Sequence, residues 1–274
     1  MSKKNCGHYS GIGGQAVLEG VMMKNNDEYA VSVRKPDGNI ETKKEKYTGI
    51  LSGSKLTKLP FIRGVFNFID SLVLGMQTLT YSASFYEEED ARETKTDQML
   101  DKVSKGNGEK LLMGLTVAFS IVLAVAIFIA LPYGISLLFH SYIRNASLLA
   151  ILEGIVRLAI FLSYVALIAG MKDIRRVYQY HGAEHKCINC LEKGRPLTVK
   201  DAMRSSRLHK RCGTSFLLFV MLISIILFMF IRVENPGLRL VVRILLIPVI
   251  AGISYEIIRL AGRSDNIFIN LISK

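Results

Sequence analysis

The stretch QYHGAEHKCINC, residues 179–190, contains two histidines, one glutamate and two cysteines. No proline separates it from the apolar run before it, so we expect that helix to continue through it. His181 and His185 would then share one helical face, because they are four residues apart. Histidine is a common zinc ligand, and a nearby carboxylate can take a proton from a metal-bound water. The stretch therefore predicts zinc on His181 and His185, with Glu184 as general base.

The order HxxEH is also the motif of the inverzincin metallohydrolases. Such a site needs a third ligand from elsewhere in the chain, and His209 and Glu256 are the candidates. A closed structural zinc site is the alternative, because a CxxC pair and an HxxC pair together suit tetrahedral zinc. Its ligands would be Cys187, Cys190, His209 and Cys212. A third interpretation is that the histidines are ordinary polar groups beside a membrane.

Four apolar runs give this stretch its context. The chain is 50% hydrophobic, and the apolar residues are concentrated in these runs. About twenty apolar residues are enough to cross the core of a bilayer. We therefore predict an α-helical integral membrane protein with about four transmembrane helices. They lie at residues 111–139, 148–171, 216–231 and 238–261, and Pro248 should kink the last one.

Basic residues predict the orientation of these helices. Most of the 35 Lys and Arg residues lie before the first run or in residues 172–211, whereas only Arg144 lies between the first two runs. By the positive-inside rule, both termini and the loop 172–214 are cytoplasmic. The four cysteines then face the reducing side, where thiols stay free to bind metal. The net charge of +12 favours contact with anionic lipid headgroups, and no specific nucleic-acid motif accompanies it.

The residues before the first run divide into three predicted parts. YAVSVRKPDGNIET, residues 29–42, supplies two extended arms around a turn at Pro36-Asp37-Gly38. The spacing of Phe61, Val65, Phe68, Leu72 and Met76 suits one face of an amphipathic helix lying at the membrane interface. The predicted parts are a small β-rich cytoplasmic unit at residues 1–57, the interfacial helix at 58–85 and a polar linker at 86–110, followed by the membrane domain at 111–274.

Two ionisable residues lie inside the second apolar run. Glu153 and Arg157 are four residues apart and so share a helical face. Ionisable groups within a bilayer usually face a partner or a cavity. The spacing predicts a buried ion pair that fixes helix packing, with a transport pathway as the alternative.

Several motifs together resemble one known family. YHGAEHKCINC, HKRCGTSFLL and GISYEIIRLAG, with GGQAVLEGVMM, KPDG and LPFIRGV nearer the start, are similar to the YqhQ-like family of uncharacterised bacterial membrane proteins. The resemblance runs from about Gly13 to Asp265. It implies a bacterial inner (plasma) membrane and a predicted metal-dependent enzyme. Family members tend to continue past the last span with a polar tail, so the end at Lys274 is expected of a shortened chain.

The resemblance also concerns particular residues. His181, Glu184, His185, His209 and Cys212 match the family's HGAEH and HxRCG positions. Cys187 and Cys190 fall where members vary, which weakens the closed cysteine site.

Three classes of function remain open from the sequence. The leading hypothesis is a zinc-dependent hydrolase at the cytoplasmic face of the membrane, acting on a peptide bond or a lipid-linked ester. A non-enzymatic scaffold or assembly factor that docks a protein or ribosome partner is the main alternative. A transporter is disfavoured, because four spans are few and only one buried pair is evident.

Overall fold

The structure, a computed structural model, describes residues 10–50, 53–54, 59–86, 108–209, 212–231, 233 and 235–263. It divides into two compact units. The first unit comprises residues 1–86, 165–223 and 246–274, and the second comprises residues 87–164 and 224–245. Nearly all of the predicted linker at 86–110 lies outside the described residues, and so does Cys6.

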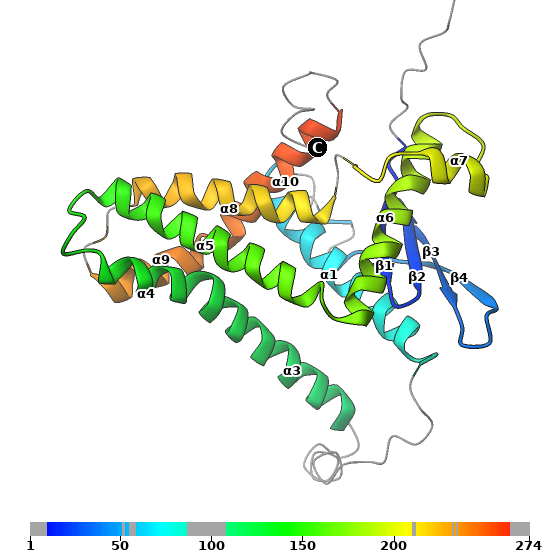
Figure 1. Cartoon of the computed structure of the whole chain (residues 1–274), viewed down its shortest axis with the longest axis horizontal. Helices are drawn as coiled ribbons and strands as arrows, with labels where there is room; N and C mark the ends of the chain where they lie inside the picture. The colour runs from blue at the N-terminus through cyan, green and yellow to red at the C-terminus, as the bar shows by residue number, and fades with distance from the viewer. Residues whose placement is uncertain are drawn as a thin grey trace, which may run out of the picture. The chain divides into compact units, whose positions relative to one another are not determined.

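The first unit begins with a four-stranded antiparallel sheet, drawn in blue in Figure 1. Its strands pair in sequence order: β1 (Gly13–Val17), β2 (Gly20–Asn25), β3 (Glu28–Arg34) and β4 (Ile40–Lys46). The predicted turn joins β3 to β4, where Gly38 adopts a φ of 86° and its N–H donates to Lys35 O at 2.9 Å. Glycine suits this left-handed conformation because it has no Cβ. The β-rich prediction is therefore confirmed as a meander.

The sheet and helix α1 (Ile62–Ala83) bury a common core. Side chains alternate along a strand, so Tyr29, Val31 and Val33 of β3 all point to the same side. Leu74 of α1, only 2% exposed, packs into the cluster that they form. The buried members of this core are Val17, Met22, Tyr29, Val31, Val33, Tyr47 and Leu74.

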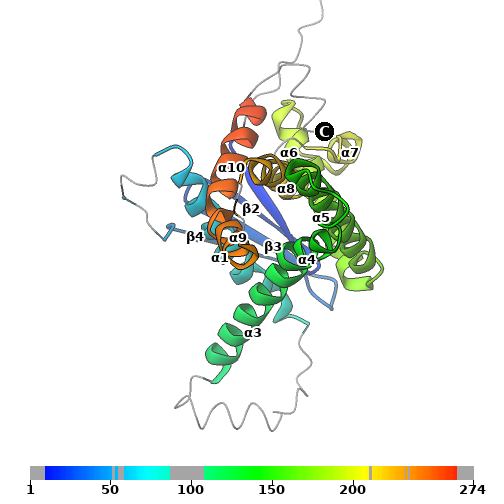
Figure 2. The same cartoon turned by 90° about the vertical axis from the view of Figure 1, so that its left-hand side faces the viewer.

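Helix α1 also packs against helix α10 (Ile247–Arg263), and Figures 1 and 2 both show the two helices side by side. Gly64 permits the close approach, because a Cβ there would lie 2.8 Å from Tyr255 Cβ. Arg63 donates from Nε and Nη2 to the two carboxylate oxygens of Glu256. The ion pair therefore ties the first turn of α1 to α10.

The predicted apolar face of α1 is exposed in part. Phe61, Leu72 and Met76 are 54%, 57% and 44% exposed. Val65 and Phe68 of the same face are half-buried, and the ring of Phe68 lies 5.2 Å from that of Phe216. The predicted helix is present. Its position at a membrane interface stays a prediction.

Helix α6 (Lys172–Glu192) carries HGAEH, so the stretch is helical as expected. It does not continue helix α5 (Ala146–Ile168) directly, because a turn at residues 169–171 separates them. Met171 there has an extended backbone with a ψ of 133°. Gly194, with a φ of 64°, ends α6, and a short helix α7 (Val199–Arg204) follows.

The β1–β2 turn attaches the sheet to α6. Glu19 accepts hydrogen bonds from Nε and Nη2 of Arg176, each at 2.6 Å, and from the Tyr180 hydroxyl at 3.0 Å. Glu19 has a positive φ of 48°, which is uncommon for a residue with a side chain. These bonds hold the turn in place and lay β1 along α6.

The rest of the described chain is mostly apolar helix. Three helical stretches are long and apolar enough to cross a membrane: Leu111–Leu138, α5 and α8 (Gly213–Phe230). The first combines α3 (Gly108–Val125), the π-helical turn η2 (Ala126–Ala130) and α4 (Leu131–Leu138). Helix α9 (Pro236–Leu245) and α10 give a fourth if they count as one bent span. The helix is interrupted at Leu246, between α9 and α10, close to Pro248 where the kink was predicted.

The core between sheet and α1 predicts the effect of two matched substitutions. Leu74→Ala removes a buried side chain and should cost about 2–5 kcal/mol. Leu72→Ala changes an exposed leucine on the same helix and should cost less than about 1 kcal/mol. Thermal unfolding of the two variants in the same detergent measures the difference. Equal destabilisation would contradict this assignment of the core.

Candidate metal centre

Three side chains with metal-binding atoms meet beside the first residue of α8. His181 and His185 come from α6, and Cys212 directly precedes α8. Their ligand atoms all lie within 4.8 Å of one another, and no other group of three such residues occurs in the described part of the chain. Cys212 Sγ lies 3.1 Å from His181 Nε2, and the two imidazole rings have centroids 4.2 Å apart. The helical spacing of four residues thus brings the histidines together, as predicted for zinc.

The other ring nitrogens of the histidines have partners that orient them. His185 Nδ1 lies 2.7 Å from Arg207 O, and a carbonyl only accepts, so Nδ1 carries the proton. His181 Nδ1 lies 3.0 Å from Glu184 Oε2. These contacts direct each Nε2 toward the cluster. Metal-binding histidines commonly have such a carbonyl or carboxylate behind them.

Glu184 is a carboxylate held at the cluster with little access to water. Its side chain is 4% exposed, and Oε2 also lies 3.8 Å from His185 Nε2. Among the described residues, Oε2 has no hydrogen-bond partner of standard geometry. A buried carboxylate is costly unless a positive charge compensates it. His181, 3.0 Å away and with a raised pKa, supplies that charge in this structure. Two imidazoles and a cysteine sulfur are also ligands that zinc prefers, so these residues fit a zinc ion.

The glycine-rich segment before and within β1 covers Glu184. A Cβ on Gly14 would lie 2.5 Å from Glu184 Oε1, so only glycine allows this approach. A cavity of about 200 Å³ lies beside the carboxylate. Its lining residues are Gly11, Ile12, Gly13, Gly14, Glu184, Ile188 and His209. Glu184 therefore faces both the cluster and a space in which a small group fits.

Side chains of α6 hold the loop that returns to the cluster. Lys186 Nζ donates to Met203 O at 2.8 Å. Asn189 Nδ2 donates to Ser206 O at 2.7 Å and to Leu208 O at 3.0 Å. These bonds lay the loop along α6, so that the residues after it approach the histidines.

Cys212 and His181 form a coupled acid–base pair. The hydrogen bond with Cys212 raises the pKa of His181 to about 10, and Glu184 contributes. Burial opposes ionisation of the Cys212 thiol, but hydrogen bonds from His181, His185 and Thr214 lower its pKa to about 5. At neutral pH the sulfur is a thiolate, which is the form that binds metal. Zinc would displace the proton from His181, because a ligating imidazole must be neutral.

The structure places the other predicted ligands differently. His209 lies next to the cluster, with its ring centroid 5.6 Å from that of His185, and its Nε2 is 3.5 Å from Glu192 Oε2. Glu256 is not brought to the cluster, because its carboxylate binds Arg63 on α1.

The closed cysteine site is not assembled among the described residues. Cys212 lies with the two histidines instead of with the CxxC pair. Cys190 is fully buried and its thiol donates toward Pro196 O at 3.5 Å. Burial raises the pKa of Cys187, which disfavours its thiolate.

The two ionisable residues of the second apolar run lie in the second unit. Glu153 and Arg157 are paired there, with Nη2 and Oε1 2.6 Å apart. Arg243 of α9 also pairs with Glu153, which the spacing of the first two residues did not indicate.

Sequence reasoning missed two features of the metal centre. Cys212 was assigned to the cysteine site, although its place in the same loop as HGAEH was the available signal for a ligand shared with the histidines. Nothing in the spacing of the first glycines pointed to a contact between Gly14 and Glu184, which are far apart in the sequence.

Two neighbouring glycines test how the segment fits over Glu184. Gly14→Ala should push the carboxylate away from the cluster, since the new Cβ and Oε1 cannot lie 2.5 Å apart. We expect it to lower both the unfolding temperature and the zinc bound by the purified protein. Gly13→Ala is the matched control, because a Cβ there meets nothing within 4 Å. Similar behaviour of the two variants in melting curves and metal analysis would show that this close approach is not needed.

Comparisons with known proteins agree with the resemblance in the motifs. Residues 59–274 match the model of a family described as protein of unknown function (DUF1385). A curated relative, described as uncharacterized protein YqhQ from Bacillus subtilis strain 168, is 34% identical over 258 residues, which covers 93% of this chain and 80% of that protein. No solved structure matches the chain. On the extent of the match, the chain belongs to the DUF1385 family.

Proposed function

We propose that the protein is a zinc-dependent hydrolase whose site lies at the cytoplasmic face of a membrane. The observation that carries the proposal is the convergence of three ligand atoms, from His181, His185 and Cys212, beside a buried carboxylate. Catalytic zinc sites characteristically have three protein ligands and keep the fourth position for water. The family match does not name an activity, so the proposal rests on this geometry alone.

Each residue of the cluster has a role in this proposal. His181, His185 and Cys212 would hold the zinc ion, which would supply activation of water for hydrolysis. Glu184 would act as the general base, since its Oε2 lies 3.8 Å from His185 Nε2. Its exclusion from solvent strengthens the interaction with the cation. The cavity beside Glu184 receives the scissile group of a substrate, a peptide bond or a lipid-linked ester.

The membrane arrangement follows from the apolar helices. We propose that Leu111–Leu138, α5 and α8 cross the inner membrane and that α9 with α10 makes a fourth, bent span. Both termini are then cytoplasmic by the positive-inside rule. Exposed apolar residues of α1, such as Leu72 and Met76, lie at the membrane interface, where basic residues nearby contact anionic headgroups.

A second candidate uses the same residues without metal. Cys212 Sγ and His181 Nε2 are 3.1 Å apart, a distance that suits a cysteine nucleophile and its histidine base. The reaction would then proceed through a covalent thioester on Cys212. The two candidates differ in whether zinc or the thiol carries the chemistry. A scaffold that docks a protein or ribosome partner is the conclusion if the site shows neither zinc nor a reactive thiol.

Metal analysis of the purified protein tests the zinc ligands. We expect wild-type protein to carry stoichiometric zinc and His185→Ala or Cys212→Ser to lose most of it, because each removes one of three ligands. Cys187→Ser is the matched control and should keep the metal, since Cys187 lies outside the group. Zinc-free wild-type protein in which Cys212 is alkylated selectively would instead favour the thiol nucleophile.

Substitution of the carboxylate tests catalysis apart from metal binding. Glu184→Gln preserves the shape of the side chain but removes the base, so any hydrolysis should fall by about 10²–10⁴-fold. Bound zinc and the melting temperature should stay close to wild type. Hydrolysis assays with peptide and lipid-ester substrates, run beside metal analysis, measure both properties. If the zinc is lost with the activity, Glu184 holds the metal and is not the base.

A further inference from the structure

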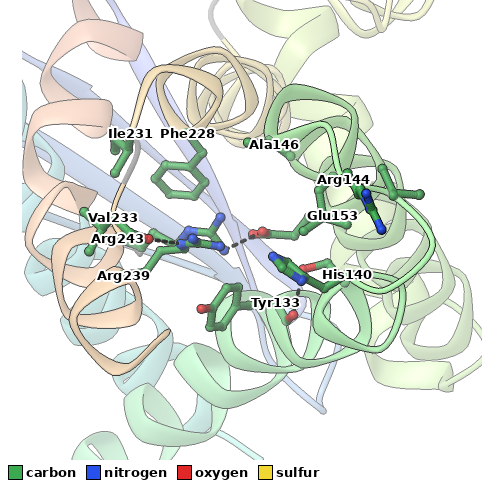
Figure 3. Close-up of a pocket in the computed structure, with 14 residues that line it drawn as sticks. Tyr133, His140, Arg144, Ala146, Glu153, Phe228, Ile231, Val233, Arg239 and Arg243 are labelled. Carbon is green, nitrogen blue, oxygen red and sulfur yellow. Dashed lines mark hydrogen bonds and ion pairs between the residues drawn. The ribbon is translucent and has the colours of Figure 1, made fainter. Parts of the chain in front are cut away.

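The second unit contains a cavity whose described lining residues carry more positive than negative charge. The cavity has a volume of about 170 Å³. Among the described residues that line it, Arg144, Arg239 and Arg243 are cationic, whereas Glu153 is the one carboxylate. Figure 3 shows the lining residues around the Arg243 guanidinium.

Arg243 is the most deeply buried of these cations, with 4% exposure. Its guanidinium carbon lies 4.5 Å from the centre of the Tyr133 ring and 4.8 Å from that of Phe228, and Figure 3 shows it between the two rings. It forms an ion pair with Glu153. Its Nε has no hydrogen-bond partner among the residues that the structure describes. One donor of a buried cation is therefore unsatisfied beside the cavity.

The single negative charge of Glu153 does not balance the positive charge around it, because two arginines share this carboxylate. Its Oε1 accepts from Arg157 Nη2 at 2.6 Å, while Oε2 pairs with Arg243. One carboxylate thus faces two guanidinium groups.

The other two nitrogens of Arg157 also have hydrogen-bond partners. Nη1 donates to Ser224 Oγ at 2.7 Å, and Nε donates to Phe128 O, in the π-helical turn η2, at 2.9 Å. Each nitrogen of Arg157 therefore has a partner, whereas Arg243 Nε has none among the described residues.

The excess of positive charge and the space beside it favour an anion as the ligand of this cavity. A buried charge is costly unless it is paired and hydrogen-bonded, and in membrane proteins such groups mark binding sites and pathways. The cavity far exceeds the roughly 10–15 Å³ that one water needs, so it has room for a tetrahedral oxyanion. Guanidinium donors match the oxygens of phosphate with particular strength. Arg239 also lines the cavity and brings another guanidinium group to it.

The location agrees with a phosphate group as the occupant. Several lining residues lie between consecutive helices: His140, Ile143 and Arg144 between α4 and α5, and Ile231 and Val233 between α8 and α9. These connections lie at the ends of long apolar helices, where a bilayer has its headgroup region. We infer that this cavity binds a phosphate-class oxyanion, supplied by an anionic lipid headgroup or by free phosphate.

Two substitutions with opposite predicted effects test the site. Delipidated protein in detergent is titrated with inorganic phosphate at constant ionic strength, with chloride as the replaced anion, and binding is followed by calorimetry. Arg243→Gln should weaken binding at least about tenfold, because it removes one partner of a buried charge interaction. Glu153→Gln should strengthen it, since Arg243 then lacks its internal carboxylate. A merely structural role predicts that both changes weaken binding.

Controls separate loss of the site from loss of the fold. Arg175→Gln makes the same chemical change on an exposed part of α6 and should leave binding unchanged. The double variant Glu153→Gln/Arg243→Gln removes the charge pair between the two residues, and the introduced amide at position 153 keeps an oxygen that can accept from Arg157 Nη2. It should keep the fold, as judged by thermal unfolding, and still fail to bind.

A lipid arm distinguishes the two sources of phosphate. Wild type and Arg243→Gln are reconstituted in nanodiscs of phosphatidylcholine with phosphatidylglycerol, extracted, and examined for retained lipid by native mass spectrometry. Retention of phosphatidylglycerol by wild type only, without binding of inorganic phosphate, identifies the headgroup as the ligand. Binding of inorganic phosphate without lipid retention identifies the free anion. The inference is overturned if neither ligand distinguishes wild type from Arg243→Gln.

Discussion

A buried carboxylate in contact with two histidines is the constraint around which the first unit is organised. Glu184 is 3% exposed and lies 3.0 Å from His181 Nδ1. Because a charge in such surroundings requires compensation, the segments around it must bring cationic or metal-binding groups. Helix α6 supplies the histidines, the loop after it supplies Cys212, and the sheet covers the remaining side through Gly14. The ion pair between Glu19 and Arg176 holds the sheet where this contact occurs.

The second unit also contains a buried carboxylate, but different groups compensate its charge. Glu153 is buried among apolar helices and faces two arginines instead of histidines and a thiol. One of these arginines, Arg157, also donates to Phe128 O in the π-helical turn η2. The charged residues that are unusual within an apolar run are thus explained by their contacts with one another. The charge that stays unbalanced, on Arg243, borders a cavity, which is why it carries an inference about a ligand.

Local patterns in the sequence predicted the local structure well. The turn at Gly38 depends on neighbouring residues, and the apolar helices depend on runs of side chains, so both were visible in the sequence. The common face of His181 and His185 follows from helical geometry alone. The break at residues 169–171 was not visible, because no proline marks it and Gly170 alone is a weak signal.

Contacts between distant segments were the part that the sequence left open. Cys212 and Glu256 both had ligand chemistry, and only the fold decides which one approaches the histidines. Arg63 captures Glu256 through the packing of α1 on α10, which no spacing rule indicates. The contact between Gly14 and the Glu184 carboxylate could not be predicted either, because the two residues are far apart in the sequence.

In the proposed metal centre, two histidines and one cysteine hold zinc and leave one position open for water. X-ray absorption spectroscopy at the zinc edge of the purified protein measures the ligand set directly. We expect one sulfur at about 2.3 Å and a shell of nitrogen or oxygen ligands at about 2.0–2.1 Å, with the imidazole scattering of two histidines. A shell dominated by sulfur, or one without sulfur, would contradict it.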